Sequence, residues 1–447
     1  MTAPPALRLR RLDLGATDAA AVVERQALFR RGAVPDEEVR AGARRILADV
    51  RSRGAIGLRA AATSFGGGLA DGRLVIEAPE LRAACDRLDP ADRAALEQAI
   101  AAITTFAEAQ RPAASTRVVT APGIEIERRW LPLRRVGCYV PGGSAPYPSS
   151  LLMTVVPARV AGVEQIVVAS PADADGNVNP VLLGAGGILG VDALLVAGGA
   201  QAIAALAFGL ADEGFEPADQ IVGPGNAWVT AAKLEVAGFV GIDLPAGPSE
   251  GLVIADDSAD PMFVAADLVT QAEHGPDSPA ILVTTSEALA DAVETEIDRL
   301  LPTLERRTIL AHALERHGRI AIAPDLGSAI AFADSYAPEH LSIDTADAEG
   351  VAERVRNAGS IFVGRWAPES AGDYATGANH VLPTGGLARA CDPLGVEAFG
   401  RYSQIQRVTE EGLAGIRETV ARLATVEGLT AHRNAVETRF RDRTPAS

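Results

Sequence analysis

The chain has 447 residues, of which 48% are hydrophobic and 22% charged, and its formal net charge is −17. Such a composition is typical of a soluble globular protein with a large buried core, and the length predicts about three domains of roughly 150 residues. The excess of negative charge disfavours a nucleic-acid partner, which leaves a basic footprint on a protein, and it also disfavours an anionic membrane surface.

The cysteines and the apolar segments indicate where the protein works. Cys85, Cys138 and Cys391 are widely separated and odd in number, which is typical of free thiols in a reducing cytoplasm. The N-terminal segment lacks the apolar core of a secretory signal. The apolar stretch 181–211 is interrupted by glycines, so two short buried elements fit it better than a membrane span of about 20 residues. We therefore expect a cytoplasmic protein without a transmembrane segment.

The first part of the chain predicts helices and then a hairpin. Asp89 and Pro90 are the residue types of a helix N-cap and first turn, and apolar residues from Leu96 to Phe106 recur on one helical face. The segment 116–140 alternates apolar and polar residues around turn residues. This pattern predicts a hairpin that leads into an extended segment.

From residue 149 onward, short apolar strands alternate with helices. The first set of strands is expected at residues 164–170, 192–198, 219–225 and 240–247. The second set is expected at residues 251–257, 279–285, 319–325 and 359–364. Strands of this kind, with helices of about 10 residues between them, predict parallel sheets that are covered on both faces.

The last part of the chain has a helical period, because Leu413, Ile416, Val420 and Leu423 recur after Thr409. The predicted fold is therefore α/β, with two Rossmann-like, doubly wound parallel-sheet domains and a small helical C-terminal unit. The expected parts are an N-terminal segment 1–25, a discontinuous first α/β domain 26–134 and 240–382, a second α/β domain 135–239, and a helical C-terminal domain 383–447.

Several polar clusters follow predicted strands or helices, and ligands of open parallel sheets collect at the carboxyl ends of strands. "GPGN" (223–226) ends a strand and opens a helix, whose free N–H groups can receive an anionic group. "AGPSE" (246–250) follows the next strand. "QAEHGPDS" (271–278) ends a helix, and on it Gln271 and His274 share one face because they stand at i and i+3.

Spacing alone leaves the cofactor question open. "GAGGILG" (184–190) lies inside a predicted helix and does not follow a strand, so a dinucleotide-binding fingerprint is missing. His274, Asp373, His380 and His432 could each bind a divalent ion. No pair of them has the spacing of a zinc finger or of HExxH, so by spacing alone ordinary polar loop residues are favoured over a metal site.

The stretch "SYAPEHLSI" (335–343) places a carboxylate beside an imidazole. Pro338 fixes its own φ and biases Ala337 toward extended backbone, so Glu339 and His340 are expected on a rigid bend and not within a helix. An acid and a base held on a stiff loop suit proton transfer. The alternative is a solvated loop end that happens to contain these two residue types.

Eight segments, spread in order over nearly the whole chain, resemble the histidinol dehydrogenase family. They are "YVPGGSAPYPSSLLMTVVPARVAGV" (139–163), "GGAQAIAALAFG" (198–209), "GPGNAWVTAAK" (223–233), "DLPAGPSE" (243–250), "DLVTQAEHGPDS" (267–278), "YAPEHL" (336–341), "PESAGDYATGANHVLPT" (368–384) and "GLTAHRNAV" (428–436).

The resemblance implies an enzyme that oxidises L-histidinol through L-histidinaldehyde to L-histidine, the last step of histidine biosynthesis. Two hydrides would pass to two NAD⁺, and a Zn²⁺ ion in each subunit would hold the substrate. The implied zinc ligands are Gln271, His274, Asp373 and His432. His432 would come from the partner subunit of a homodimer, which the C-terminal domain would reach.

The same resemblance implies roles for the other motif residues. Glu339 and His340 would be the general bases. Substrate contacts would come from the zinc ligands and from His340, His380, Ser249 and Glu427. The NAD site would involve Tyr139, Gln201 and Asn226. For Ser249 and Asn226, turn or cap duty could coexist with ligand contact.

Two other functions compete with this one. A family member could act on another alcohol, such as a sulfonated diol, but its anionic group would require a basic residue near Glu427. A zinc hydrolase could use Glu339 as the base on water and would need no nicotinamide cofactor. Cys138 has no cationic neighbour in the sequence, so buried packing is favoured over a nucleophilic role.

Overall fold

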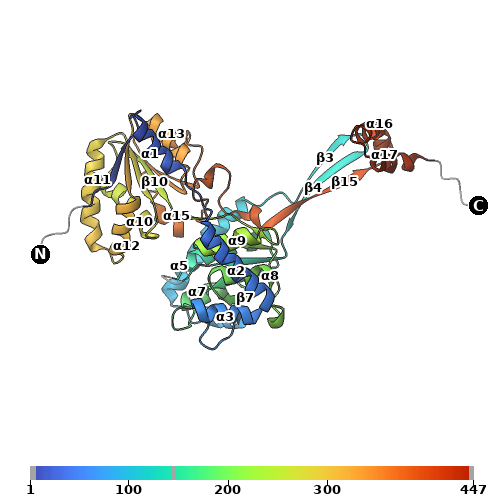
Figure 1. The fold of residues 1–447 in the computed structure, drawn as a ribbon, viewed down its shortest axis with the longest axis horizontal. Helices are drawn as coiled ribbons and strands as arrows, with labels where there is room; N and C mark the ends of the chain where they lie inside the picture. Colours follow the sequence, from blue (N-terminus) through green and yellow to red (C-terminus); the bar gives the residue numbers. More distant parts are fainter. Residues whose placement is uncertain (1–6, 143–145, 442–447) are drawn as a thin grey trace, which may run out of the picture. The chain divides into compact units, whose positions relative to one another are not determined.

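The computed structural model describes residues 7–142 and 146–441, and the chain folds into two compact units. Unit 1 consists of Met1–Gln110 and Leu133–Phe399, and unit 2 consists of Arg111–Pro132 and Gly400–Ser447. Unit 1 contains two six-stranded sheets, and unit 2 contains a three-stranded sheet. Figure 1 shows the ribbon and labels many of the elements of each unit.

The first sheet of unit 1 is parallel throughout. Its order is β1 (Arg10–Asp13), β12 (Arg319–Ile322), β11 (Ala280–Thr284), β10 (Gly251–Ala255), β13 (His340–Asp344) and β14 (Ser360–Val363). One face is covered by α10 (Pro261–Glu273), α11 (Glu287–Leu300) and α12 (Arg307–His317), and the other by α1 (Ala19–Phe29), α13 (Leu326–Tyr336) and α14 (Ala348–Ala352). Because the chain order reverses between β10 and β13, the sheet is doubly wound.

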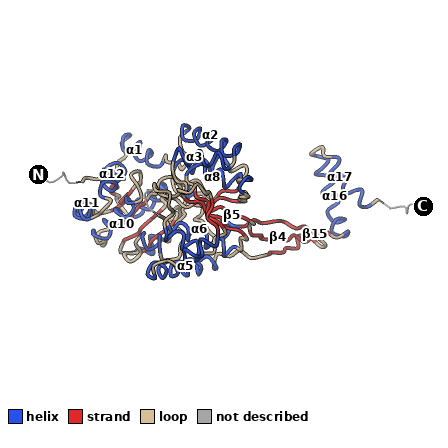
Figure 2. Tube along the Cα trace, turned by 90° about the horizontal axis from the view of Figure 1, so that it is seen from below, coloured by secondary structure: helices blue, strands red, loops and turns tan. Residues whose placement is uncertain are grey.

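The second sheet of unit 1 has a similar design. Its order is β2 (Val75–Glu77), β7 (Ala193–Val196), β6 (Gln165–Ser170), β5 (Arg135–Tyr139), β8 (Gln220–Val222) and β9 (Gly241–Ile242), and only β2 is antiparallel. As Figure 2 shows, one face carries α2 (Glu37–Arg53), α3 (Ala55–Phe65) and α8 (Gly199–Phe208), and the other carries α5 (Pro90–Ala109) and α6 (Pro148–Ala161). The first face also holds α9 (Ala227–Val236), and the second also holds α4 (Ala78–Cys85) and α7 (Pro180–Ile188).

Unit 2 is an antiparallel ribbon followed by two helices. The strand order is β15 (Gly400–Val408), β4 (Ile124–Pro132) and β3 (Ser115–Ala121). The helices α16 (Glu410–Val426) and α17 (Thr430–Glu437) pack on one another. Gly123, in the turn between β3 and β4, has a φ of 76° and leaves no room for a Cβ beside Thr409 and Gly412, so glycine is required there.

The predicted fold class and several predicted elements are confirmed. The side chain of Asp89 accepts a hydrogen bond from the N–H of Ala91 at 2.8 Å and caps α5. Thr409 caps α16 in the same way, through the N–H of Gly412 at 3.1 Å. The hairpin β3–β4 and the extended β5 follow each other as predicted. These elements were predictable because their signals are local.

The parts of the chain are grouped differently from the predicted domain boundaries. Residues 26–134 were expected to share a domain with residues 240–382, but α2, α4 and α5 pack on helices of the second sheet and β2 pairs with β7. Residues 400–408 were expected in a helical domain, but they form β15 and pair with β4. Periodicity shows that an element has an apolar face, but it does not show which sheet that face covers.

The apolar stretch 181–211 forms α7, β7 and α8, which are short buried elements as predicted. "GAGGILG" (184–190) begins inside α7, so the absence of a strand before it is confirmed. Within the described part of the chain, no helix combines the length and the apolar character that a membrane span requires. The three cysteines are free, and burial raises the pKa of the Cys138 thiol to about 12, which agrees with a packing role.

Candidate active site

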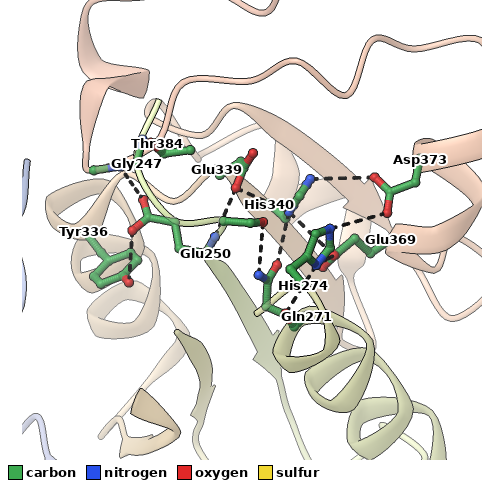
Figure 3. A network of polar contacts seen from close by, with 12 residues as sticks. Gly247, Glu250, Gln271, His274, Tyr336, Glu339, His340, Glu369, Asp373 and Thr384 are labelled. Carbon is green, nitrogen blue, oxygen red and sulfur yellow. Dashed lines mark hydrogen bonds and ion pairs between the residues drawn. The ribbon is translucent and has the colours of Figure 1, made fainter. Parts of the chain in front are cut away.

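A cluster of polar side chains gathers at the amino ends of β10 and β13 (Figure 3). Gly251 lies opposite His340, and the N–H of His340 donates to the carbonyl of Glu250 at 3.2 Å. Glu250, just before β10, therefore lies beside Glu339, just before β13, and Ser249 comes one residue earlier. The expectation that polar clusters mark carboxyl ends is wrong for this sheet, because the loop that follows β9 is also the loop that precedes β10.

The C-terminal end of α10 supplies Gln271 and His274. The Gln271 side chain donates through Nε2 to Ser249 Oγ at 3.1 Å, and its Oε1 lies 3.1 Å from His340 Nδ1. His274 Nδ1 lies 3.2 Å from the carbonyl oxygen of Gln271, so its Nε2 is left for another partner. A Cβ on Gly251 would lie 2.6 Å from Gln271 Oε1, and the glycine thus admits the amide into the cluster.

The short helix α15 (Glu369–Tyr374) adds two carboxylates at i and i+4, which share one face. Asp373 lies on the Nε2 side of both imidazoles, 3.9 Å from His274 Nε2 and 4.0 Å from His340 Nε2. Glu369 lies on their Nδ1 side, with Oε1 3.7 Å from His274 Nδ1 and 3.6 Å from His340 Nδ1. The two carboxylates therefore face opposite edges of the same pair of rings (Figure 3).

His380 extends the cluster toward the helices of the second sheet. Its Nδ1 lies 3.0 Å from the carbonyl oxygen of Asp373, and its Nε2 lies 3.4 Å from Ser150 Oγ at the start of α6. The imidazole is thus tied at both nitrogens. One of its contacts fixes it to the helix that carries Asp373.

Burial shifts the pKa values of the central groups. It raises the pKa of Glu339 well above its ordinary value, against hydrogen bonds from Ser249 and from the N–H of Glu250, the latter at 3.0 Å. Burial, with smaller contributions from the neighbouring imidazoles, lowers the pKa of His340 well below its ordinary value. A neutral imidazole and a carboxylate of raised basicity are both good proton acceptors.

Three side chains could hold a cation together. One ligand atom each from His274, Glu369 and Asp373 lies within 4.8 Å of the others. Among the residues that the structure describes, His340 Nε2 and Glu369 Oε1 are buried and have no hydrogen-bond partner, which is costly for polar atoms unless a ligand or an ion satisfies them. Imidazole nitrogens with carboxylate and amide oxygens are a donor set that suits zinc. The residues present therefore fit a metal site.

The turn before Glu339 differs from its prediction. Ala337 was expected to be extended because a proline follows it, but it has φ 51° and ψ 67° and is left-handed. Its N–H still donates to the carbonyl of Ala333 at 2.6 Å and ends α13, and only residues 337–339 connect the helix to β13. The other half of the prediction is confirmed, since Glu339 lies outside a helix and His340 begins a strand.

Tyr139, Gln201 and Asn226 lie at the carboxyl edge of the second sheet. Tyr139 ends β5, and its hydroxyl accepts a hydrogen bond from the N–H of Gly199 at 3.1 Å, at the start of the helix that contains Gln201. Asn226 caps α9 by accepting from the N–H of Trp228 at 3.0 Å. Gly223 has a φ of 114° and lies against the carbonyl of Tyr139, which brings "GPGN" next to β5.

Comparison with known proteins identifies the family. A family model described as histidinol dehydrogenase matches residues 29–440. The chain belongs to the histidinol dehydrogenase family. A histidinol dehydrogenase from Leifsonia xyli subsp. xyli is 47% identical over 402 residues, which is 89% of this chain and 92% of that protein. One from Methanosarcina barkeri is 44% identical over 417 residues, which is 93% of this chain and 95% of that protein.

A solved structure shares the fold. The crystal structure of a histidinol dehydrogenase from Elizabethkingia anophelis is 36% identical, covers 96% of this chain and 98% of that one, and matches it with a TM-score of 0.88. The resemblance inferred from eight sequence segments is thereby confirmed, and so is the α/β fold class.

The chain brings most of the predicted site residues together within unit 1. Those in the cluster around β10 and β13 are Ser249, Gln271, His274, Glu339, His340, Asp373 and His380. The predicted cofactor residues occupy the carboxyl edge of the second sheet. Glu427 follows α16 and His432 lies on α17, and both are exposed side chains of unit 2.

Glu369 belongs to the cluster but was not among the predicted site residues. It lies in "PESAGDY", four residues before Asp373, and the helix places both on one face. A test for acidic pairs at i and i+4 next to a proposed ligand would have found it. The side chain of Glu369 is buried, unlike the exposed acids of the chain, and local spacing does not predict this burial.

Proposed function

We propose that the chain oxidises L-histidinol to L-histidine through L-histidinaldehyde, with two NAD⁺ consumed for each substrate, as the last step of histidine biosynthesis. The observation that carries this proposal is the buried Glu339–His340 pair beside side chains that could hold a cation, in a chain of this family. One pair of proton acceptors can serve both oxidations.

We assign the metal to zinc, bound by Gln271, His274, Asp373 and the His432 of a partner subunit. His274 Nε2 and Asp373 Oδ2 are 3.9 Å apart, and two bonds of about 2.1 Å to one ion can span that distance. When bound, zinc would hold the imidazole and amine nitrogens of the substrate and orient its carbinol carbon. Glu369 faces the Nδ1 edges of the rings, so we assign it to support of the imidazoles and not to metal binding.

His340 is the base of the alcohol step. Its Nδ1–H donates to Gln271 Oε1, which leaves the lone pair on Nε2, and a lowered pKa keeps the ring neutral at physiological pH. His340 Nε2 takes the hydroxyl proton while the carbinol hydrogen leaves as hydride, and the product is the aldehyde. Nε2 is buried and has no hydrogen-bond partner within residues 7–142 and 146–441, so no competing bond from these residues has to be broken first.

Glu339 is the base of the hydration step. It takes a proton from the water that adds to the aldehyde carbon, and its raised pKa makes it a stronger acceptor than an exposed carboxylate. His340 returns its first proton to the carbonyl oxygen as the water adds, and it then takes a hydroxyl proton of the hydrate while the second hydride leaves, which gives the carboxylic acid. Ser249 and His380 would contact the substrate, and Glu427 would balance its ammonium group.

The NAD site is assigned to the carboxyl edge of the second sheet, with Tyr139, Gln201 and Asn226. NAD⁺, when bound, would supply the acceptor for both hydrides. Two features support the site: α8 begins after Gly198 without a side-chain cap, and "GPGN" opens α9. Helix N-termini at a strand edge favour anionic groups such as a pyrophosphate.

The proposed assembly is a homodimer with a shared active site. The support is that His432 and Glu427 belong to unit 2, whereas the remaining site residues belong to unit 1. We place the protein in the cytoplasm, because three free cysteines suit a reducing compartment.

The test of this function is the absorbance of reduced nicotinamide after L-histidinol and NAD⁺ are added to the purified, zinc-loaded protein. The expected result is two NADH for each L-histidinol. One NADH with accumulating aldehyde would contradict the two-step proposal, and turnover of other alcohols without turnover of L-histidinol would contradict the substrate.

A further inference from the structure

The turn that delivers Glu339 and His340 to the site is strained. Ala337 is fully buried, and it is the one non-glycine residue of the described chain with a positive φ. An L-residue meets steric conflict in this left-handed conformation, and such residues persist where the surrounding structure holds them in place. Something outside the turn must therefore keep Ala337 from relaxing.

Arg31, from the segment between α1 and α2, contacts the turn directly. Its Nη2 donates to the carbonyl of Tyr336 at 2.8 Å, one residue before the strained position. Its guanidinium carbon lies 3.3 Å from the centre of the Tyr336 ring, so the cation stacks on the aromatic face. Arg31 thus fixes both the carbonyl and the aromatic ring of Tyr336, the residue before Ala337.

Glu250 joins Arg31 to both proposed bases. Its carboxylate accepts from Arg31 Nη2 at 2.6 Å and from the N–H of Gly385 at 3.0 Å, and it is buried. Its backbone N–H donates to Glu339 Oε2 at 3.0 Å, and its carbonyl accepts from the N–H of His340 at 3.2 Å. Figure 3 shows Glu250 between Tyr336 on one side and Glu339 on the other. A shift of Glu250 would therefore move both bases.

We infer that Arg31 and Glu250 form a brace that holds Ala337 in its left-handed conformation and so positions Glu339 and His340. Both are positioning residues, because in the described structure they act through the turn and through the backbone of residue 250. A buried ion pair adds little net stability but can fix one arrangement among several. The inference rests on the proposed function, since it takes residues 339 and 340 as the bases.

The experiment is a cycle of variants in the full-length, zinc-loaded protein: Arg31→Met, Ala337→Gly and the double variant. Arg31→Met is expected to lower kcat for L-histidinol by about 10- to 100-fold, because small misplacements of catalytic groups have such effects. KM for NAD⁺ should stay within about threefold of its normal value, since the cofactor edge lies on the other sheet. Zinc content should not change. Arg30→Met is the matched control, because Arg30 is the exposed neighbour of Arg31.

The deciding comparison is rescue. Glycine adopts positive φ without strain, so Ala337→Gly in the Arg31→Met background should restore kcat by at least about fivefold. A merely structural role of Arg31 predicts that Ala337→Gly raises the thermal midpoint equally in both backgrounds and restores no kcat. An unrescued double variant, or an Arg31→Met enzyme as fast as the Arg30→Met control, would overturn the inference. If Arg31→Met fails to fold, Arg31→Lys takes its place, because lysine keeps the charge but loses the stacked, forked geometry.

Different experimental results would contradict the inferred brace and the proposed function. Lack of L-histidinol oxidation by the unaltered protein would count against the proposed function alone. In that case a crystal structure of Arg31→Met tests the brace, with φ of Ala337 expected to become negative. Retention of the left-handed conformation without Arg31 would overturn the inference whatever the substrate.

Discussion

The Nδ1–H of His340 donates to the side-chain oxygen of Gln271 at 3.1 Å, and the other ring nitrogen, Nε2, has no hydrogen-bond partner in the described part of the chain. Gln271 itself donates through Nε2 to Ser249 Oγ at 3.1 Å, so its side-chain oxygen is turned toward His340 and fixes the tautomer of that ring. The proposed base is thus oriented before any substrate arrives, which is what efficient proton transfer needs.

Replacement of His340 by Asn is therefore expected to slow alcohol oxidation by about 10²- to 10⁴-fold, the usual range for loss of a general base. The measurement is the initial rate of NADH formation from L-histidinol. His312→Asn is the control, because His312 is exposed on α12. Unchanged KM with the lower kcat would place the loss in the chemical step. A fast His340→Asn enzyme would remove His340 from the mechanism.

Replacement of Glu339 by Gln is expected to affect the second oxidation more than the first. Glutamine keeps an oxygen that can accept the N–H of Glu250, so the turn should survive, but the basic carboxylate is lost. NADH for each L-histidinol should fall from two toward one, and a carbonyl reagent should trap the aldehyde. Glu273→Gln is the control, because Glu273 is an exposed acid at the end of α10. Two NADH for each substrate in Glu339→Gln would reject the role given to this carboxylate.

The two carboxylates of α15 should respond differently in metal binding. Asp373 faces His274 Nε2 at 3.9 Å, so Asp373→Ala should leave the dialysed protein with little zinc. Glu369 faces the Nδ1 atoms, so Glu369→Gln should keep about one zinc in each chain but bind it roughly tenfold more weakly. Metal analysis and chelator competition give both quantities. The opposite pattern, with an empty Glu369→Gln protein and a zinc-loaded Asp373→Ala protein, would exchange the two roles.

Much of the site was predictable because its signals are short-range. Gln271 and His274 share a helical face by spacing alone, and Asp260 caps the helix that carries them. Glu339 and His340 were predicted outside a helix because of Pro338. The ligand set and the cofactor residues came from resemblance, since no spacing distinguishes those polar residues from ordinary loop residues.

What the sequence did not predict depends on long-range contacts. Arg31 and Glu250 are more than 200 positions apart, and the brace inferred from their contact acts on a residue, Ala337, that departs from the backbone that a following proline favours. β15 pairs with β4 across a similar separation and was taken for part of a helical domain. Local propensity is overridden where a distant partner supplies the hydrogen bonds.

Unit 2 should lose stability in acid through Glu127. Arg407 lies 2.7 Å from this carboxylate, and that contact, with Arg129 and Arg117 nearby, lowers the pKa of Glu127 to about 2. A depressed folded-state pKa stabilises the fold above the unfolded value near 4.5, and the stabilisation is lost as pH falls toward 2. Glu127→Gln should thus lower the urea midpoint of unfolding at pH 7. The difference in urea midpoint between this variant and the unaltered protein should become smaller below about pH 5. Glu125→Gln is the control, and a difference that does not change with pH would contradict this account.

The shared active site makes a prediction about mixtures. His432→Ala protein and His340→Ala protein should each be inactive, because one lacks a zinc ligand in unit 2 and the other lacks the base in unit 1. If each site takes His432 from its partner, a mixed dimer holds one site with both defects and one intact site. Equal amounts, dissociated and reassociated at random, should recover about a quarter of the unaltered activity, because half of the dimers are mixed and each has one working site. If both residues of a site came from the same chain, no mixed dimer would contain an intact site. Persistent inactivity of a mixture shown to contain mixed dimers would therefore contradict the shared site.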